Sequence, residues 1–217
     1  MAFDWIAGTA LAVGMGSLYL TYQSTKAAKR AIDTSIELYE KQKQDEYNKK
    51  IESEKREKEA IRKVVAIELS RICDVIVKLY ELKAALMGGV SSVKRSSIES
   101  TNVIIIHDNN GVRLKDIYIH SDANEIPIDV FLRSSVLCNN LYLDISDVKI
   151  NMSILNKQLA FCYDYIENAD ISFLFDFLNQ SGTTEILNQM YNTMKLFTKE
   201  LESYPVYENL CNIMEAK

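Results

Sequence analysis

The chain contains no glycine and no proline between Gly16 and Gly88, and this interval constrains its fold more than any other feature. Proline breaks the hydrogen-bond ladder of a helix and glycine weakens it, so their absence favours continuous helix. Two prolines and seven glycines in 217 residues are also too few for the frequent turns of an all-β protein. We therefore expect a mostly α-helical chain in which one helix could run through this whole interval.

The beginning of the chain is uncharged and apolar, because residues 5–23 read WIAGTALAVGMGSLYLTYQ. About 20 residues of helix rise about 30 Å, which is the thickness of the hydrocarbon core of a bilayer. A signal peptide would begin with basic residues, whereas only Asp4 precedes this run. The sequence predicts a single transmembrane helix over 1–25, with a buried core helix as the alternative.

The orientation of this helix follows from the charges that flank it. Positive charge marks the side of a membrane segment that stays in the cytoplasm. Three bases follow the apolar run at once, namely Lys26, Lys29 and Arg30. We expect a single-pass protein of the inner (cytoplasmic) membrane, with its N-terminus outside and its C-terminus in the cytoplasm.

Small residues recur along the apolar segment at a spacing that places them on one helix face. Gly8, Ala12 and Gly16 are four residues apart, and Ala10, Gly14 and Ser17 form a second small patch. In lipid, helices associate through close backbone approach, which small residues permit. The first patch predicts a homo-oligomer that packs or forms a pore through this helix. The alternative is that glycine and alanine are simply common in membrane helices.

Residues 26–60 are highly charged, and acids stand four residues before bases, as in Glu37 and Lys41. Such pairs stabilise an isolated helix by roughly 0.3 kcal/mol each. The pattern predicts a charged helical stalk whose charges face solvent. Its apolar residues are too widely interrupted to indicate a coiled coil, although they could contact a neighbouring chain: Ile32, Ile36, Tyr39, Tyr47 and Ile51.

Residues 61–217 have the apolar spacing of a helical domain. One stripe begins at Ile61 and ends at Leu86, and further helices are expected at about 128–140, 145–168, 171–179, 183–203 and after Pro205. After the stripe that ends at Leu86, residues 88–101 are expected to form a loop. Two β-type runs joined by Asn110-Gly111 then predict a β-hairpin at about 102–119.

Motifs for catalysis, cofactors or metals are absent from the sequence, so we expect no enzyme, no cofactor and no metal. Its four cysteines are far apart and read as free thiols. Arg113 and His120 have the spacing of the Arg and His pair of helical ribonucleases, but they fall in a predicted strand. A membrane-tethered nuclease is therefore the least favoured reading.

Charge is unevenly distributed, because from Ser134 onward 11 acids face only 5 bases. Non-specific nucleic-acid binding is not expected there, since such binding depends on neutralising phosphates. An anion site is expected earlier, and a phosphate-bearing ligand could be held if the side chains converge. The candidate residues, which could also be scattered solubilising charges, are Lys94, Arg95, Arg113, Lys115 and Arg133.

The layout of a small-residue membrane helix (Gly8, Ala12, Gly16), a charged stalk and a compact helical domain resembles small membrane-anchored bacterial phage-defence effectors. These include pore-forming accessory proteins of RNA-targeting CRISPR systems and Hailong-type membrane effectors. The resemblance is architectural and implies an oligomeric pore or channel gated through its cytoplasmic domain. It also implies a nucleotide or oligonucleotide activator, or a cytosolic defence protein as partner. A passive anchor or scaffold for a cytosolic partner is the alternative.

Overall fold

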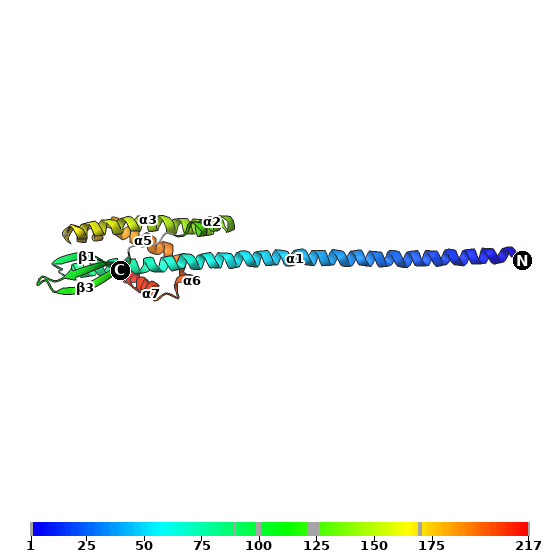
Figure 1. The fold of residues 1–217 in the computed structure, drawn as a ribbon, viewed down its shortest axis with the longest axis horizontal. Coiled ribbons are helices and arrows are strands. Elements are labelled where there is room, and N and C mark those ends of the chain that lie inside the picture. The colour runs from blue at the N-terminus through cyan, green and yellow to red at the C-terminus, as the bar shows by residue number, and fades with distance from the viewer. Residues whose placement is uncertain (1, 89, 99–100, 121–125, 169–170, 217) are drawn as a thin grey trace. The chain divides into compact units, whose positions relative to one another are not determined.

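The computed structural model describes residues 2–88, 90–98, 101–120, 126–168 and 171–216. It is mostly helical and contains one small antiparallel sheet, which confirms the predicted fold class at this level (Figure 1). In chain order the elements are α1 (Ala2–Met87), β1 (Ser92–Ile98), β2 (Thr101–His107), β3 (Arg113–His120), α2 (Ile128–Leu137), α3 (Asn139–Glu167), α4 (Ile171–Asn179), α5 (Ser181–Lys195), α6 (Thr198–Leu201) and α7 (Pro205–Glu215).

Helix α1 runs through the whole interval that lacks helix breakers and ends one residue before Gly88. The Gly88 amide donates to the Ala85 carbonyl at 3.0 Å and closes the last turn. By its internal contacts the chain divides into two units, 1–55 and 56–217. The sequence predicts the boundary between the stalk and the helical domain at residues 60 and 61, five residues later. We call these units the N-terminal unit and the C-terminal unit.

No helix within the described ranges is both long enough and apolar enough to cross a membrane. The transmembrane helix predicted over 1–25 is therefore not confirmed. The physical reason is composition, because glycines, hydroxyl residues and tyrosines dilute the apolar side chains of residues 5–23.

The sheet has three strands in the order β1-β2-β3, all antiparallel. The hairpin of β2 and β3 was predicted at about 102–119, and it is present. The loop predicted at 88–101 is wrong in its central part, because β1 pairs with β2 from Ser92 opposite His107 to Ile98 opposite Thr101. Strand β1 has few apolar residues, so its strand conformation depends on its neighbour's backbone groups and not on its own pattern.

The turn between β2 and β3 is built by Asp108 and Gly111. The Gly111 amide donates to the Asp108 carbonyl at 3.0 Å, and the Asp108 carboxylate accepts from the Asn110 and Val112 amides, both at 2.8 Å. Gly111 has φ = 76°, a conformation that side-chain-bearing residues rarely adopt. The glycine of the predicted Asn-Gly turn is thus required by the backbone.

The remaining helices follow the predicted periodicity but differ at their boundaries. The helical conformation is interrupted at Cys138, where the backbone is extended. Helix α2 therefore ends earlier, and α3 begins earlier, than expected. The helix predicted over 183–203 is two helices, α5 and α6, separated at Leu196 and Phe197. Phe197, which lies at this break, is fully buried.

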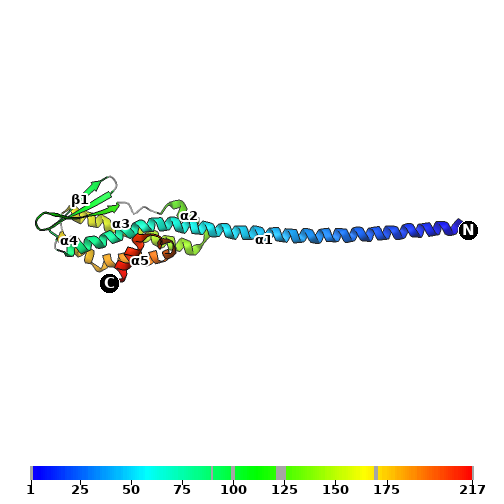
Figure 2. The same ribbon diagram turned by 90° about the horizontal axis from the view of Figure 1, so that it is seen from below.

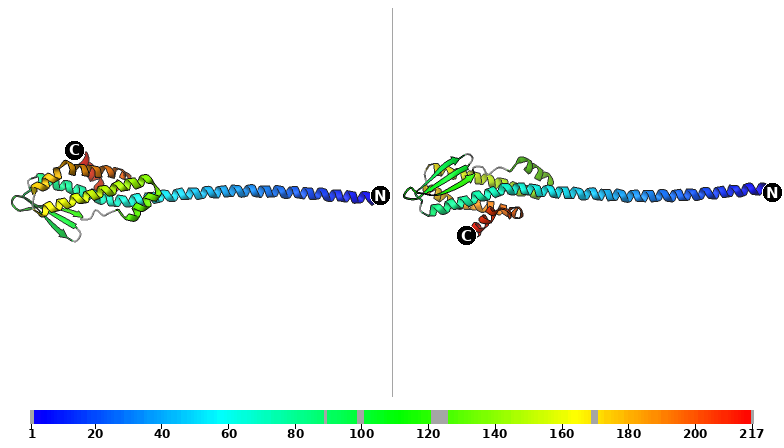
Figure 3. Two further views of the ribbon diagram at one scale, coloured as in Figure 1. Left: turned by 90° about the horizontal axis from the view of Figure 1, so that it is seen from above. Right: turned by 60° about the horizontal axis from the view of Figure 1, so that its bottom comes forward.

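The core of the C-terminal unit joins one face of α1 to α3, α5 and the inner face of the sheet. Leu69, Ile72 and Ile76 of α1 are fully buried, as the predicted stripe requires. In the figures, α3 runs alongside this part of α1, and the sheet lies near its Met87 end (Figures 1 and 2). Helix α2 lies toward the opposite end of the C-terminal unit (Figure 3).

Candidate functional site

The N-terminal unit exposes large apolar side chains on opposite faces of its helix. Leu18 is 72% exposed and Leu20 is 69% exposed. Because successive helical residues are about 100° apart, these two side chains point in nearly opposite directions. The other exposed apolar residues of this segment are Trp5, Ile6, Leu11, Val13, Met15, Tyr19 and Tyr22. A helix that is apolar all round is normally surrounded by an apolar environment or by other helices.

Several polar side chains of this segment form hydrogen bonds within their own helix. The Thr9 hydroxyl donates to the Ile6 carbonyl at 2.9 Å, and the Thr21 hydroxyl donates to the Ser17 carbonyl at 2.8 Å. The Gln23 amide donates to the Tyr19 hydroxyl at 2.8 Å. Such local bonds remove much of the cost of placing a hydroxyl in an apolar environment.

The small residues of the segment leave open space around the helix. A Cβ atom added at Gly8, Gly14 or Gly16 would meet no atom within 4 Å. Larger residues at these positions therefore disturb nothing in the chain itself. Beyond a gain in helix propensity, an effect of enlarging Gly8 or Gly16 in the predicted packing face is therefore expected to arise from contacts with other molecules.

The predicted anion site is dispersed, and four of its five bases form ion pairs with different carboxylates. The pairs are Arg95 with Glu167, Arg113 with Asp116, Lys115 with Glu81 at 2.8 Å and Arg133 with Glu57 at 3.5 Å. Arg133 lies on α2, whereas Lys94, Arg95, Arg113 and Lys115 lie on the sheet. The sequence could not show that these four bases each have a carboxylate partner.

Arg95 has a role in packing between β1 and α3. Its guanidinium lies 4.4 Å from the centre of the Tyr163 ring, and its Nε donates to the Asn102 amide oxygen at 2.8 Å. Burial raises the pKa of Tyr163 to about 12, so the phenol stays protonated. A cation over an aromatic ring with a carboxylate beside it is a structural contact.

Of the two residues considered for a nuclease, Arg113 and His120, the structure describes the side chain of Arg113 only. Arg113 forms its ion pair with Asp116 within β3, and this hydrogen bond from Arg113 holds the pKa of Asp116 below its usual range. The side chain of His120 lies outside the described part of the structure. His107, the other histidine, has a buried Nδ1 atom without a hydrogen-bond partner among the described residues.

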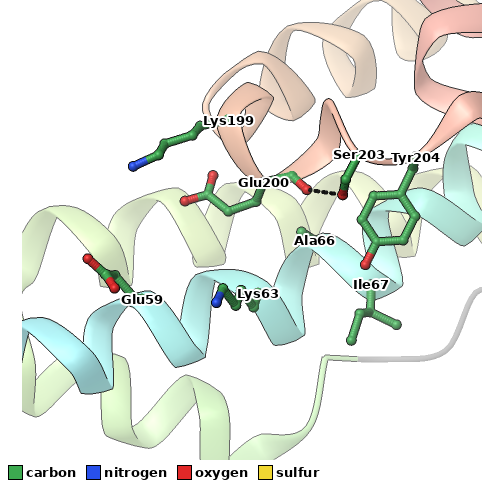
Figure 4. A pocket seen from close by; sticks show the side chains of 8 residues that line it. All are labelled: Glu59, Lys63, Ala66, Ile67, Lys199, Glu200, Ser203 and Tyr204. Carbon is green, nitrogen blue, oxygen red and sulfur yellow. Dashed lines mark hydrogen bonds between the residues drawn. The ribbon is translucent and has the colours of Figure 1, made fainter.

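A pocket of 510 Å³ lies between α1 and the segment that contains α6 (Figure 4). Two acids and two bases line it, namely Glu59, Lys63, Lys199 and Glu200. Arg62 holds the Glu200 carboxylate through two hydrogen bonds of 2.6 and 3.1 Å and also donates to the Leu196 carbonyl. The hydrogen bond from Arg62 holds the pKa of Glu200 below its usual range. The charged residues of its described lining are thus equal in number for the two signs.

A second pocket, of 580 Å³, lies against α7 and carries more acids than bases. Its charged lining residues are Lys195, Glu202, Glu208 and Glu215. Two tyrosines also line it, and burial raises the pKa of both Tyr191 and Tyr207. This wall is unsuitable for a phosphate-bearing ligand because the carboxylates would repel it.

The four cysteines are free, as predicted. Burial raises the pKa of Cys73 and of Cys162 to about 12, whereas backbone amides of Leu141 and Asn140 lower the pKa of Cys138 at the start of α3. Within the described ranges, no group of three or more histidines, cysteines and acids could hold a metal ion.

Comparisons with protein-family models, with curated proteins and with solved structures found no match to this chain. The candidate functional surfaces are therefore defined by this chain's own residues. They are the apolar surface of residues 5–23 and the pockets of the C-terminal unit.

Proposed function

We propose that the protein is a homo-oligomeric membrane effector whose N-terminal helices assemble into a pore or channel gated through the C-terminal unit. The supporting observation is that residues 5–23 of the N-terminal unit expose large apolar side chains on opposite helix faces. Apolar surface on this scale is stable only when lipid or other chains cover it.

The modest hydropathy of the segment is compatible with this proposal. Glycine, serine and threonine lower its apolar character, and they are also the residues that let membrane helices pack closely. In an oligomer only part of each helix perimeter contacts lipid, so an assembled helix needs fewer large apolar residues than a solitary span. The hydroxyls that bond back to their own helix reduce the remaining cost.

The bases Lys26, Lys29 and Arg30 support an orientation with the C-terminal unit in the cytoplasm of a bacterium, at its inner membrane. There the C-terminal unit would sense the activating signal. A role in anti-phage defence rests on the architectural resemblance alone. The alternative of a passive anchor shares the same N-terminal helix, so the two readings differ only in whether the helices conduct ions.

The test replaces the packing face by Gly8→Leu, Ala12→Leu and Gly16→Leu together. Because the glycine positions face open space within the chain, the helix should persist and insertion should be retained or improved. Close helix contact should be lost, and with it ion conductance and toxicity in a bacterial membrane-potential assay. Flotation with vesicles measures insertion separately.

The matched control is the conservative variant Leu11→Ile, Val13→Ile and Leu20→Ile, which keeps large side chains and the small face. It should depolarise membranes as the wild type does. Wild-type conductance from the triple leucine variant would refute a pore packed through Gly8, Ala12 and Gly16. A wild type that floats with vesicles but does not conduct ions would refute the pore and leave the anchor reading. Failure of the wild type to float with vesicles would refute the membrane location itself.

A further inference from the structure

A third pocket, of 400 Å³, lies on the exposed side of α3 and differs in its charge from the two pockets described above. Lys149, Ser153 and Lys157 are each four residues apart and therefore share one helix face. Asn156 adds an amide, and the buried side chains of Met152 and Ile126 supply apolar surface. Among its described lining residues no carboxyl group is present.

The two lysines are conspicuous because bases are rare in this part of the chain. From Ser134 onward there are 5 bases against 11 acids, and two of the five line this one pocket. No ion pair within the described residues involves either of them. Lys149 instead lies 5.3 Å from the centre of the Phe131 ring. Both ammonium groups are thus available to an external anion.

From this geometry we infer that the α3 pocket binds a phosphate-bearing small molecule with an apolar or aromatic body, of the size of a nucleotide. Lysine ammonium groups bind phosphate as point charges. The two lysines are separated by about 12 Å of helix rise, and their flexible side chains can meet one phosphate group or two neighbouring ones. The body of the ligand contacts Met152 and Ile126, while the exposed Ser153 hydroxyl offers a hydrogen bond.

The pocket volume agrees with this ligand class, since small-molecule sites usually measure about 300–1,000 Å³. The proposed function makes the C-terminal unit a sensor, and this inference names its ligand site. Only the role of this site as a sensor rests on the proposed function. Binding of the ligand is a property of the protein whether or not a pore forms.

The test measures binding of adenosine diphosphate to the full chain by isothermal titration calorimetry. The variant with Lys149→Gln and Lys157→Gln should bind at least about tenfold more weakly, because it loses charge-assisted contacts. The matched control carries Lys195→Gln and Lys199→Gln, which removes the same charge from pockets that contain acids. It should bind within about twofold of the wild type, since it leaves the contacts of the α3 pocket in place.

A second variant, Ser153→Phe, keeps both lysines and fills the space between them. Ser153 is exposed, so the change leaves the core intact, and binding should be lost. Two further probes, inorganic phosphate and uncharged adenosine, should each bind more weakly than adenosine diphosphate.

The inference is overturned if the wild type does not bind adenosine diphosphate, or if both double variants lose affinity equally. Undiminished binding by the Ser153→Phe variant would refute a shaped pocket. Equal affinity for inorganic phosphate would refute the contribution of an organic body. None of these results bears on conductance, so failure of this site and failure of the proposed pore are distinguishable.

Discussion

The two ends of helix α1 carry similar apolar spacing but have opposite surroundings. In the N-terminal unit, Ile32 and Ile36 are 59% and 52% exposed. In the C-terminal unit, Leu69, Ile72 and Ile76 are fully buried against helices and strands that come later in the chain. A stripe of apolar residues therefore shows that a helix face prefers to be covered, but it does not show what covers it.

The comparison also separates two sources of helix stability. Residues 56–87 of α1 are stabilised by the core, whereas residues 26–55 depend on helix propensity and on charge pairs of roughly 0.3 kcal/mol each. An isolated helix of this kind is marginal in water, so an external partner would stabilise it more than it would stabilise the C-terminal unit. Three substitution pairs test the difference.

The largest effect is expected at the buried end of the helix. Leu69→Ala removes a fully buried side chain and should lower the free energy of unfolding of the C-terminal unit by about 2–5 kcal/mol. Leu18→Ala, in the exposed segment, should leave that free energy unchanged. Hydrogen exchange read by mass spectrometry reports both units separately. Similar losses from both variants would show that the two units do not differ in this way.

A smaller effect is expected from an ion pair. Arg62→Met leaves the Glu200 carboxylate without its partner and should cost about 1–3 kcal/mol at neutral pH. Arg62 lowers the pKa of Glu200 from its ordinary value of 4.5, so this stabilisation is present above that pH and disappears as pH falls through the lowered value. Chemical denaturation at pH 7 and at pH 3 should show the difference between variant and wild type shrinking.

The control for the ion pair is Lys41→Met, which removes a base from an exposed pair expected from the sequence of the stalk. It should change the unfolding free energy of the C-terminal unit by less than about 0.5 kcal/mol at either pH. A difference for Arg62→Met that is constant with pH would show that packing on Phe197, and not the charge of Glu200, accounts for the loss.

The smallest effect contrasts two glycines. Gly111→Ala forces a side chain into a backbone with φ = 76° and should destabilise the sheet by roughly 1–2 kcal/mol. Gly16→Ala lies within a helix with free space around it and should raise helix stability by about 1 kcal/mol. Thermal unfolding by circular dichroism would measure both. Equal signs for the two changes would contradict the assigned backbone of the turn.

Prediction from sequence succeeded where a residue pattern reports a local preference. The interval without glycine or proline predicted α1, and the buried residues Leu155, Leu159, Cys162 and Ile166 lie on the predicted stripe of α3. Asn110-Gly111 predicted the turn, because its positive φ is a local requirement. The break between α2 and α3 was predicted a few residues too late, because no glycine or proline near Cys138 indicates its extended conformation.

Prediction failed where the outcome depends on partners that are distant in sequence. Strand β1 forms because the edge of β2 offers backbone hydrogen bonds, which its own polar sequence does not reveal. The predicted anion site stays a prediction, but the sequence did not reveal that Arg95 of β1 pairs with Glu167 of α3. Lys149 and Lys157 were passed over because no motif distinguishes them from solvated surface charges.

The sequence by itself determined the helical class, the long first helix, the turn at Gly111 and the apolar faces, because each follows from dihedral preferences and spacing within a few residues. Only the tertiary structure decided which charges are neutralised and which remain available. Ion pairing depends on distances between side chains that folding brings together, such as Arg62 and Glu200, 138 residues apart in the chain. The same folding leaves Lys149 and Lys157 beside one pocket without a carboxylate among its described lining residues.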